Sequence, residues 1–98
     1  MELPANLDQL AVVHNEAAQQ FEIPVEYGLC VLQYRVSAGK MIVYHTEVPP
    51  FIQGRGLAAR MTREALGYAR RNQLKVEPRC PYTAAFMHTN REYYELLA

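Results

Sequence analysis

The run from Tyr44 to Arg63 constrains this chain most, because a strand-like segment, two prolines, a glycine-rich turn and an amphipathic helix follow one another there. At its centre Gly54 and Gly56 flank Arg55. Glycine lacks a Cβ, so both positions can adopt positive φ and bring the backbone close to a ligand. The helix start leaves its first N–H groups without intrahelical partners and carries a partial positive charge. The run therefore predicts a phosphate-type anion site, and a turn that only starts a helix is the alternative.

Arginine side chains in and after the turn favour the anion site. Arg55 lies between the glycines and Arg60 lies one turn into the helix, and a guanidinium can hold phosphate oxygens with two parallel hydrogen bonds. Basic residues are concentrated between positions 55 and 79, although Lys+Arg and Asp+Glu balance at ten each over the 98 residues. A local anionic ligand fits this distribution better than a duplex, so we expect no nucleic-acid binding.

Four strands are predicted before the glycine turn, because apolar and polar residues alternate there between turn and proline signals. Their ranges are 11–14, 20–23, 28–36 and 41–48. The second strand is expected to stop at Pro24. In the turn 37–40, Gly39 is expected to take positive φ and to make a hairpin of the third and fourth strands.

The residues after the turn predict a helix over 56–72, a strand over 74–77 and a second helical region with parts at 82–87 and 91–97. The stripe of the first helix that faces the core comprises Leu57, Met61, Ala65, Tyr68 and Ala69. A strand–helix–strand connection of this length places its two strands parallel in one sheet. We therefore predict an α+β fold: a mixed, mainly antiparallel β-sheet of about five strands, a central helix and a C-terminal helical region, in one domain over 1–98.

Membrane, secretory and metal-centred classes are not expected. No apolar run approaches the ~20 residues of a membrane span. Residues 1–10 contain neither the basic first region nor the apolar second region of a secretory signal peptide. The pattern of these first residues is weak, and Pro4 disfavours a helix there. Cys30 and Cys80 lack the spacing of a disulfide framework or a zinc site, so we expect free thiols, no metal and a cytoplasmic protein.

The order of several short motifs resembles a known superfamily. The run QGRGLA at 53–58 matches the Q/R-x-x-G-x-G/A signature of the GNAT superfamily of N-acetyltransferases. Upstream lie HN at 14–15, FE at 21–22 and HTEV at 45–48, and downstream lie CP at 80–81 and AA at 84–85. Together they make the chain from about residue 12 onward similar to the short, single-domain YjdJ-type branch of that superfamily.

The resemblance implies that acetyl-CoA binds in a V-shaped gap between the HTEV strand and the strand that ends near Arg79. The strand edge from Thr46 to Val48 would pair with the pantetheine arm, the glycine turn would hold the pyrophosphate, and two arginines would assist. The implied contacts are Thr46, Val48, Gln53, Gly54, Arg55, Gly56, Leu57, Ala58, Arg60 and Cys80.

Chemistry in this superfamily is usually direct attack of an amine on the thioester, which needs a base, a donor for the carbonyl oxygen and an acid. Glu47 is the first candidate base, acting directly or through water, and His45 is the second. Alternation along the strand puts both on one face with Met41 and Val43, roughly 7 Å apart, which leaves room for a water relay. The alternative is a supporting histidine and a salt-bridge glutamate.

Cys80 stands where commoner members of the superfamily place an asparagine, and Phe86 and Met87 occupy the neighbourhood of the usual tyrosine acid. Tyr82 is a weak substitute, whereas Cys80 is a candidate acid or a transient acetyl acceptor. A thiol reacts as a thiolate, and a helix start or Arg79 beside it would lower its pKa. The alternative is a small buried thiol packed near the pantetheine.

These features predict a small N-acetyltransferase that moves an acetyl group from acetyl-CoA to an amine. The segment 15–20 leaves no room for the helices that shape the acceptor pocket in larger relatives. We therefore expect an open site for a small-molecule or protein amine, such as a lysine or a polyamine, in a monomer or a homodimer. The alternative functions are a non-catalytic acyl-CoA-binding module or regulator, and an interaction domain that binds no ligand.

Overall fold

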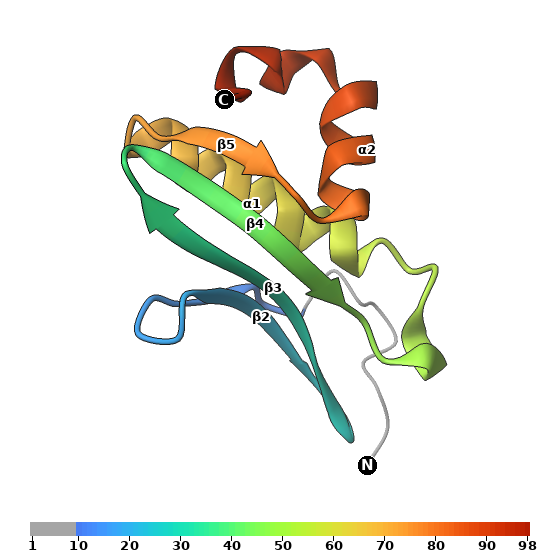
Figure 1. Ribbon diagram of the computed structural model, residues 1–98. Helices are drawn as coiled ribbons and strands as arrows, with labels where there is room; N and C mark the ends of the chain where they lie inside the picture. The colour runs from blue at the N-terminus through green and yellow to red at the C-terminus, as the bar shows by residue number, and fades with distance from the viewer. Residues whose placement is uncertain (1–9) are drawn as a thin grey trace.

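A computed structural model describes residues 10–98, which form one five-stranded sheet with a helix packed across one face (Figure 1). The strands lie in sequence order, antiparallel except for the last pair. The elements are β1 (Val13–Asn15), β2 (Gln20–Val25), β3 (Gly28–Ser37), β4 (Lys40–Glu47), η2 (Pro50–Ile52), α1 (Leu57–Arg71), β5 (Lys75–Pro78), α2 (Pro81–Thr89) and η3 (Arg91–Leu96). The predicted mixed α+β fold is confirmed.

Every predicted strand and helix that falls within the described residues is present, with ends within two residues of the prediction. The connection from β4 through α1 to β5 makes β5 parallel to β4, because a helical crossover returns the chain to the same end of the sheet. The β3–β4 turn is also as predicted: Gly39 has φ 76° and Ala38 has φ 52°. Positive φ at both central residues matches the twist of a two-residue hairpin. The predictions for residues 1–9 lie outside the described part.

The prediction that the second strand stops at Pro24 is wrong. β2 continues to Val25, and Pro24 lies opposite Leu29 in β3. On the other side, β1 pairs with β2 only as far as Glu22, so β2 has a single neighbour at the proline. A proline is tolerated at such an edge because its missing N–H removes no hydrogen bond of the sheet.

The predicted alternation of β4 is also wrong, and this correction reaches the candidate site. Val43 pairs with Tyr34, but His45 pairs with Gln33, so Tyr44 is an extra residue without a partner in β3. Such a β-bulge shifts the alternation by one residue. Before the bulge Val43 faces the core, whereas after it Thr46 faces the core side and His45 faces away.

Two faces of the sheet are distinguished below. The inner face packs against α1 and carries Phe21, Leu32 and Thr46 in one row across the strands. The outer face is the opposite one and carries Gln33 and His45 in the next row.

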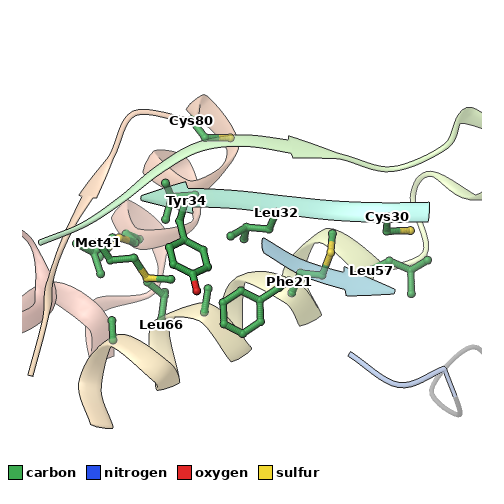
Figure 2. Close-up of a cluster of buried hydrophobic side chains, with 14 of the residues drawn as sticks. Phe21, Cys30, Leu32, Tyr34, Met41, Leu57, Leu66 and Cys80 are labelled. Carbon is green, nitrogen blue, oxygen red and sulfur yellow. The ribbon is translucent and has the colours of Figure 1, made fainter. Parts of the chain in front are cut away.

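The core lies between the inner face and α1 (Figure 2). The predicted stripe of α1 is buried except for the half-buried Tyr68, and the helix also buries Thr62 and Leu66. The buried arc is therefore wider than predicted, because α1 contacts α2 and η3 as well as the strands. Burial of an aliphatic side chain contributes roughly 1.5–3 kcal/mol, so this arc holds α1 firmly on the sheet.

A histidine lies among aromatic rings at the start of the sheet. His14 stacks on Phe21 with ring centroids 4.0 Å apart, and its Nε2 lies 2.5 Å from the hydroxyl of Tyr34. Burial lowers the pKa of His14, although Glu16 opposes that shift and Arg71 adds to it. Burial is also the main reason that the pKa of Tyr34 rises to about 12.

Stability is expected to depend on pH through His14. Its pKa is lowered in the folded state, so the unfolded chain binds more protons below about pH 6.5 and stability falls as the pH decreases through that value. In H14F, the change in the free energy of unfolding between about pH 7 and pH 5 should be smaller than in wild type. Urea titrations at each pH measure this, with H88Q as the control that keeps the wild-type dependence. An equal pH dependence in H14F would contradict the assignment.

Candidate functional site

The glycine turn adopts the predicted left-handed conformation. Gly54 has φ 79° and Gly56, the N-cap of α1, has φ 78°. A Cβ added to either residue would meet no protein atom within 4 Å. The glycines are therefore required by their backbone conformation, and the space beside them is open to a ligand.

The start of α1 presents backbone donors beside this open space. The first intrahelical hydrogen bond runs from the amide of Arg60 to the carbonyl of Gly56, at 3.1 Å. The amides of Leu57, Ala58 and Ala59 precede it, so the helix supplies them with no acceptor. The first turn holds no acidic residue and Gly56 has no side chain to cap it. Together the free amides and the helix dipole favour an anion here.

A groove of about 280 Å³ opens over this helix start. Its lining comprises Thr46, Val48, Ile52, Gln53, Gly54, Gly56, Leu57, Ala58, Ala59 and Tyr82. The structure thus brings together most of the residues predicted for the site. Ile52 and Ala59 also line the groove but were not predicted, although Ile52 directly precedes the six-residue signature and Ala59 directly follows it.

The predicted polar side chains of the turn have other contacts. The side-chain amide of Gln53 donates to the carbonyl of Val48 at 2.9 Å and so ties the two ends of the loop together. The guanidinium of Arg60 donates to the carbonyl of Leu10 at 2.6 Å. Within the described residues the groove lining includes neither Arg60 nor the exposed Arg55, so their phosphate contacts stay predictions.

The predicted gap between β4 and β5 begins at Val43. The β4–β5 pairing ends where Val43 meets Pro78, and the amides of Arg79 and Cys80 both donate to the Val43 carbonyl, each at 2.9 Å. Beyond this point β4 continues through its bulge to Thr46, while the other chain segment turns into α2. The two backbones therefore separate on the side of the sheet where the groove lies.

Cys80 spans this gap with its side chain. Its Sγ lies 3.4 Å from the hydroxyl oxygen of Thr46, and the residue is only 5% exposed, at the edge of the core cluster (Figure 2). Burial raises the pKa of the Cys80 thiol, but the neighbouring Thr46 hydroxyl, the backbone N–H groups of Thr83 and Tyr82 and the Thr83 hydroxyl favour the thiolate by more than that, so the pKa is lowered overall. The thiolate is the reactive form of cysteine.

Arg79 does not act on Cys80 in the way that the sequence suggested. Its Nε donates to the carboxylate of Glu77, and no charge contributes to the lowered pKa of Cys80. The other cysteine differs in kind: Cys30 is fully buried, and burial raises its pKa. Cys30 thus belongs to the core, and the prediction that both thiols are free is confirmed.

His45 and Glu47 lie on the outer face of β4, away from Thr46 and Cys80. The imidazole Nε2 of His45 is 3.2 Å from Glu47 Oε1, and both side chains are exposed. The two groups therefore touch directly, whereas strand geometry predicted a spacing of roughly 7 Å with room for a water. The structure thus separates three of the four predicted catalytic residues into an outer pair and an inner thiol.

Tyr82 is the second residue of α2 and lies at the groove. It lines the groove, is 40% exposed, and its ring is stacked on Phe86 with centroids 6.3 Å apart. Burial raises the pKa of Tyr82, and the charge of Arg63 partly opposes this shift. A phenol with a raised pKa holds its proton at neutral pH, which is what a hydrogen-bond donor or an acid requires.

This chain is similar to known proteins. A family model described as GCN5-related N-acetyl-transferase matches residues 20–96, a span that contains the glycine turn, β4 and Cys80. The chain belongs to the GCN5-related N-acetyltransferase family. This GNAT membership confirms the predicted enzyme class at the level of the family. The narrower YjdJ-type branch stays a prediction.

Individual relatives agree with this assignment. Protein NATD1 from Mus musculus is 32% identical over 94 residues, covering 89% of this chain and 84% of that protein. Protein NATD1 from Homo sapiens is 32% identical over 85 residues, covering 83% and 74%. The NMR structure of a GCN5-like protein from Staphylococcus aureus superposes on this chain with a TM-score of 0.73 at 22% identity, covering 91% and 88%. This last likeness shows that the GNAT fold is shared.

GNAT proteins generally use acetyl-CoA, and the glycine turn, the free amides of α1 and the open groove fit its phosphates. Among residues 10–98 no cluster of three His, Cys, Asp or Glu side chains could hold a metal ion. None of the helices in the same residues is both long and apolar enough to cross a bilayer.

Replacing Gly56 should separate backbone strain from ligand binding in this GNAT protein. G56A places a methyl group in the open space and strains a left-handed residue by roughly 1–2 kcal/mol. G39A is a matched control, because Gly39 has φ 76°, has equally open space and lies in a distant hairpin turn. Both variants should lose similar stability, but only G56A should weaken acetyl-CoA binding, by about tenfold or more, or roughly 1.4 kcal/mol. Isothermal titration calorimetry measures the affinity of each variant for acetyl-CoA. An equal loss of affinity in G56A and G39A would exclude a specific role of Gly56.

Proposed function

We propose that this chain is a small N-acetyltransferase that transfers an acetyl group from acetyl-CoA to an amine, with residues 1–98 acting as one domain. The observation that carries the proposal is the continuity of the groove, which runs from the helix start at Gly56 to Thr46, the residue that touches Cys80. One groove thus joins the proposed phosphate-binding site at the start of α1 to the proposed reacting group beside Thr46. Family membership supplies the reaction class.

In this proposal the backbone amides from Gly54 to Ala58 hold the pyrophosphate of acetyl-CoA. The edge of β4 from Thr46 to Val48 takes the pantetheine arm, because the gap beyond Val43 leaves that edge unpaired by β5. The acetyl group then lies near Cys80. Arg55 and Arg60 are assigned the supporting contacts to phosphate that Arg side chains favour.

The amine acceptor is proposed to approach from the outer face, where His45 and Glu47 lie. The connection between β1 and β2 is the short turn 16–19, so no helix is inserted there to cover this face. The open surface suits an exposed amine on a small molecule or a protein, such as a lysine or a polyamine. A cytoplasmic monomer or homodimer is the proposed form.

Direct transfer is the proposed chemistry. Glu47 takes a proton from the substrate ammonium, and the neutral nitrogen attacks the acetyl carbonyl. A C–N bond forms, the C–S bond to CoA breaks, and the leaving thiolate receives a proton from Tyr82 or Cys80. His45 holds the Glu47 carboxylate at 3.2 Å and so orients the base. The competing route passes the acetyl group first to the Cys80 thiolate and then to the amine.

Removing the proposed base should reduce turnover without removing the cosubstrate. E47Q is expected to lower kcat by about 10²–10⁴-fold while the KM for acetyl-CoA changes little, because a positioned base contributes that range and Glu47 lies outside the groove lining. Glu64, an exposed residue of α1, supplies the control E64Q. CoA release is followed with a panel of amines. A kcat of E47Q equal to that of E64Q would remove Glu47 from the mechanism.

The intact mass of the protein after incubation with acetyl-CoA distinguishes the two routes. Direct transfer predicts no gain in mass in wild type together with turnover of an amine. A gain of one acetyl group that persists in C30A and disappears in C80A would instead assign the covalent route. If the wild type releases CoA with no amine of a broad panel yet still binds acetyl-CoA, the chain is a non-catalytic acyl-CoA-binding module and the proposed function is wrong.

A further inference from the structure

Thr83 has a buried hydroxyl for which the described residues offer no hydrogen-bond partner. The hydroxyls of the other two threonines in the helices each donate to the backbone carbonyl four residues earlier. Thr62 bonds to Ala58 at 2.8 Å, and Thr89 bonds to Ala85 at 3.1 Å. Buried polar groups in native proteins are almost always hydrogen-bonded. The exception at Thr83 therefore calls for a partner that the resting thiol form of the protein does not provide.

The place of Thr83 in α2 explains why it lacks the usual partner. The helix begins at Pro81, so Thr83 is its third residue, and the residue four positions earlier is Arg79, before the helix. The carbonyl four residues back, which Thr62 uses within α1, therefore lies outside α2, and the Thr83 hydroxyl bonds neither to it nor to another carbonyl of the described residues. Instead Thr83 follows the N-cap residue Cys80 by three positions, which places the two side chains on the same side of the helix start.

Cys80 thus has a threonine hydroxyl on each of two elements. On β4, Thr46 Oγ1 lies 3.4 Å from Cys80 Sγ. On α2, the Thr83 hydroxyl is close enough to help to lower the pKa of the thiol, as Thr46 does, against the opposing effect of burial. A neutral thiol is a poor acceptor, whereas a thiolate accepts strong, charge-assisted hydrogen bonds.

The charged groups of the surrounding elements are engaged elsewhere. Arg79 at the end of β5 donates to Glu77, and the guanidinium of Arg63 on α1 lies 5.7 Å from the ring centroid of Phe86. On β4 the side chains of His45 and Glu47 are on the outer face. None of them contributes to the lowered pKa of Cys80, so the neutral donors are its main source.

We propose that the hydroxyls of Thr46 and Thr83 form a two-donor cradle for the Cys80 thiolate, and that Thr83 is a positioning residue whose hydroxyl gains its partner when the thiol loses its proton. The proton passes to solvent, and no bond between heavy atoms changes. The cradle deepens the role of Cys80 and rests on the proposed function for its use in acetyl transfer.

The test follows the alkylation of Cys80 by iodoacetamide as a function of pH, in the full chain without acetyl-CoA. Peptide mass spectrometry assigns the modified cysteine. T83V, which removes the hydroxyl at nearly constant volume, should raise the midpoint of the profile by about half a unit to one unit, so that the thiolate fraction near pH 7 falls about threefold to tenfold. T83S retains a hydroxyl and should retain the wild-type midpoint. The control T62V removes an equally buried hydroxyl that bonds within α1 and should also leave the midpoint unchanged.

Two further readouts exclude a merely structural role. Because the Thr83 hydroxyl has no partner in the thiol form, T83V should melt at or above the temperature of wild type, whereas loss of a structural hydrogen bond would lower it. If T83V does not fold, T83A supplies the same measurement, and the ultraviolet absorbance of the thiolate, taken as the difference from C80S, gives the midpoint without a reagent.

An unchanged midpoint in T83V, or an equal shift in T62V, overturns the cradle. If T83V shifts the midpoint only when acetyl-CoA is present, the Thr83 hydroxyl contacts the ligand rather than the thiolate, and the cradle is overturned as well. Failure of acetyl transfer itself is a separate result, because iodoacetamide reacts with Cys80 whether or not the chain acetylates an amine.

Discussion

The carbonyl of Val43 is the point on which the site depends. It accepts hydrogen bonds from the amides of both Arg79 and Cys80, and these bonds end the parallel pairing of β4 with β5. Had the ladder continued, the edge of β4 near Thr46 would be occupied by a neighbouring strand. Because it stops, that edge is free, α2 begins at once, and Cys80 is fixed as the residue that caps α2 beside Thr46.

The bulge at Tyr44 is the second constraint, because it decides which face of the sheet each candidate side chain of β4 occupies. One extra residue reverses the alternation of β4, so Thr46 joins the groove and the pair formed by His45 and Glu47 turns to the outer face. In the proposed function this puts the cosubstrate on one side of the sheet and the acceptor on the other. The reacting atoms would meet in the gap between the strands, where backbone and side chains approach from both sides.

The elements of the fold are predictable from local patterns, whereas two details of their pairing are not. Alternation, glycine and proline positions indicate every element within residues 10–98 except the three-residue η2, since these patterns reflect burial and backbone freedom of neighbouring residues. The prediction at Pro24 is wrong because the effect of a proline depends on whether β1 extends beside it. The predicted face of His45 is wrong because a bulge of a single residue leaves no clear mark in a short apolar run. The contact of Cys80 with Thr46 joins residues far apart in the chain, and no local spacing indicates it.

The sequence by itself determined the strand–turn–helix unit and the positive φ of Gly54 and Gly56, because glycine chemistry and helix ends are local properties, and it predicts an anion site beside them. Its motifs also sufficed to indicate the GNAT family, to which the family model assigns residues 20–96. Only the tertiary structure decided where Val43 ends the ladder, which face His45 and Glu47 occupy, and which hydroxyls surround Cys80. These features depend on register and packing between separate segments, and such long-range pairings are fixed only when the whole sheet and its helices are assembled.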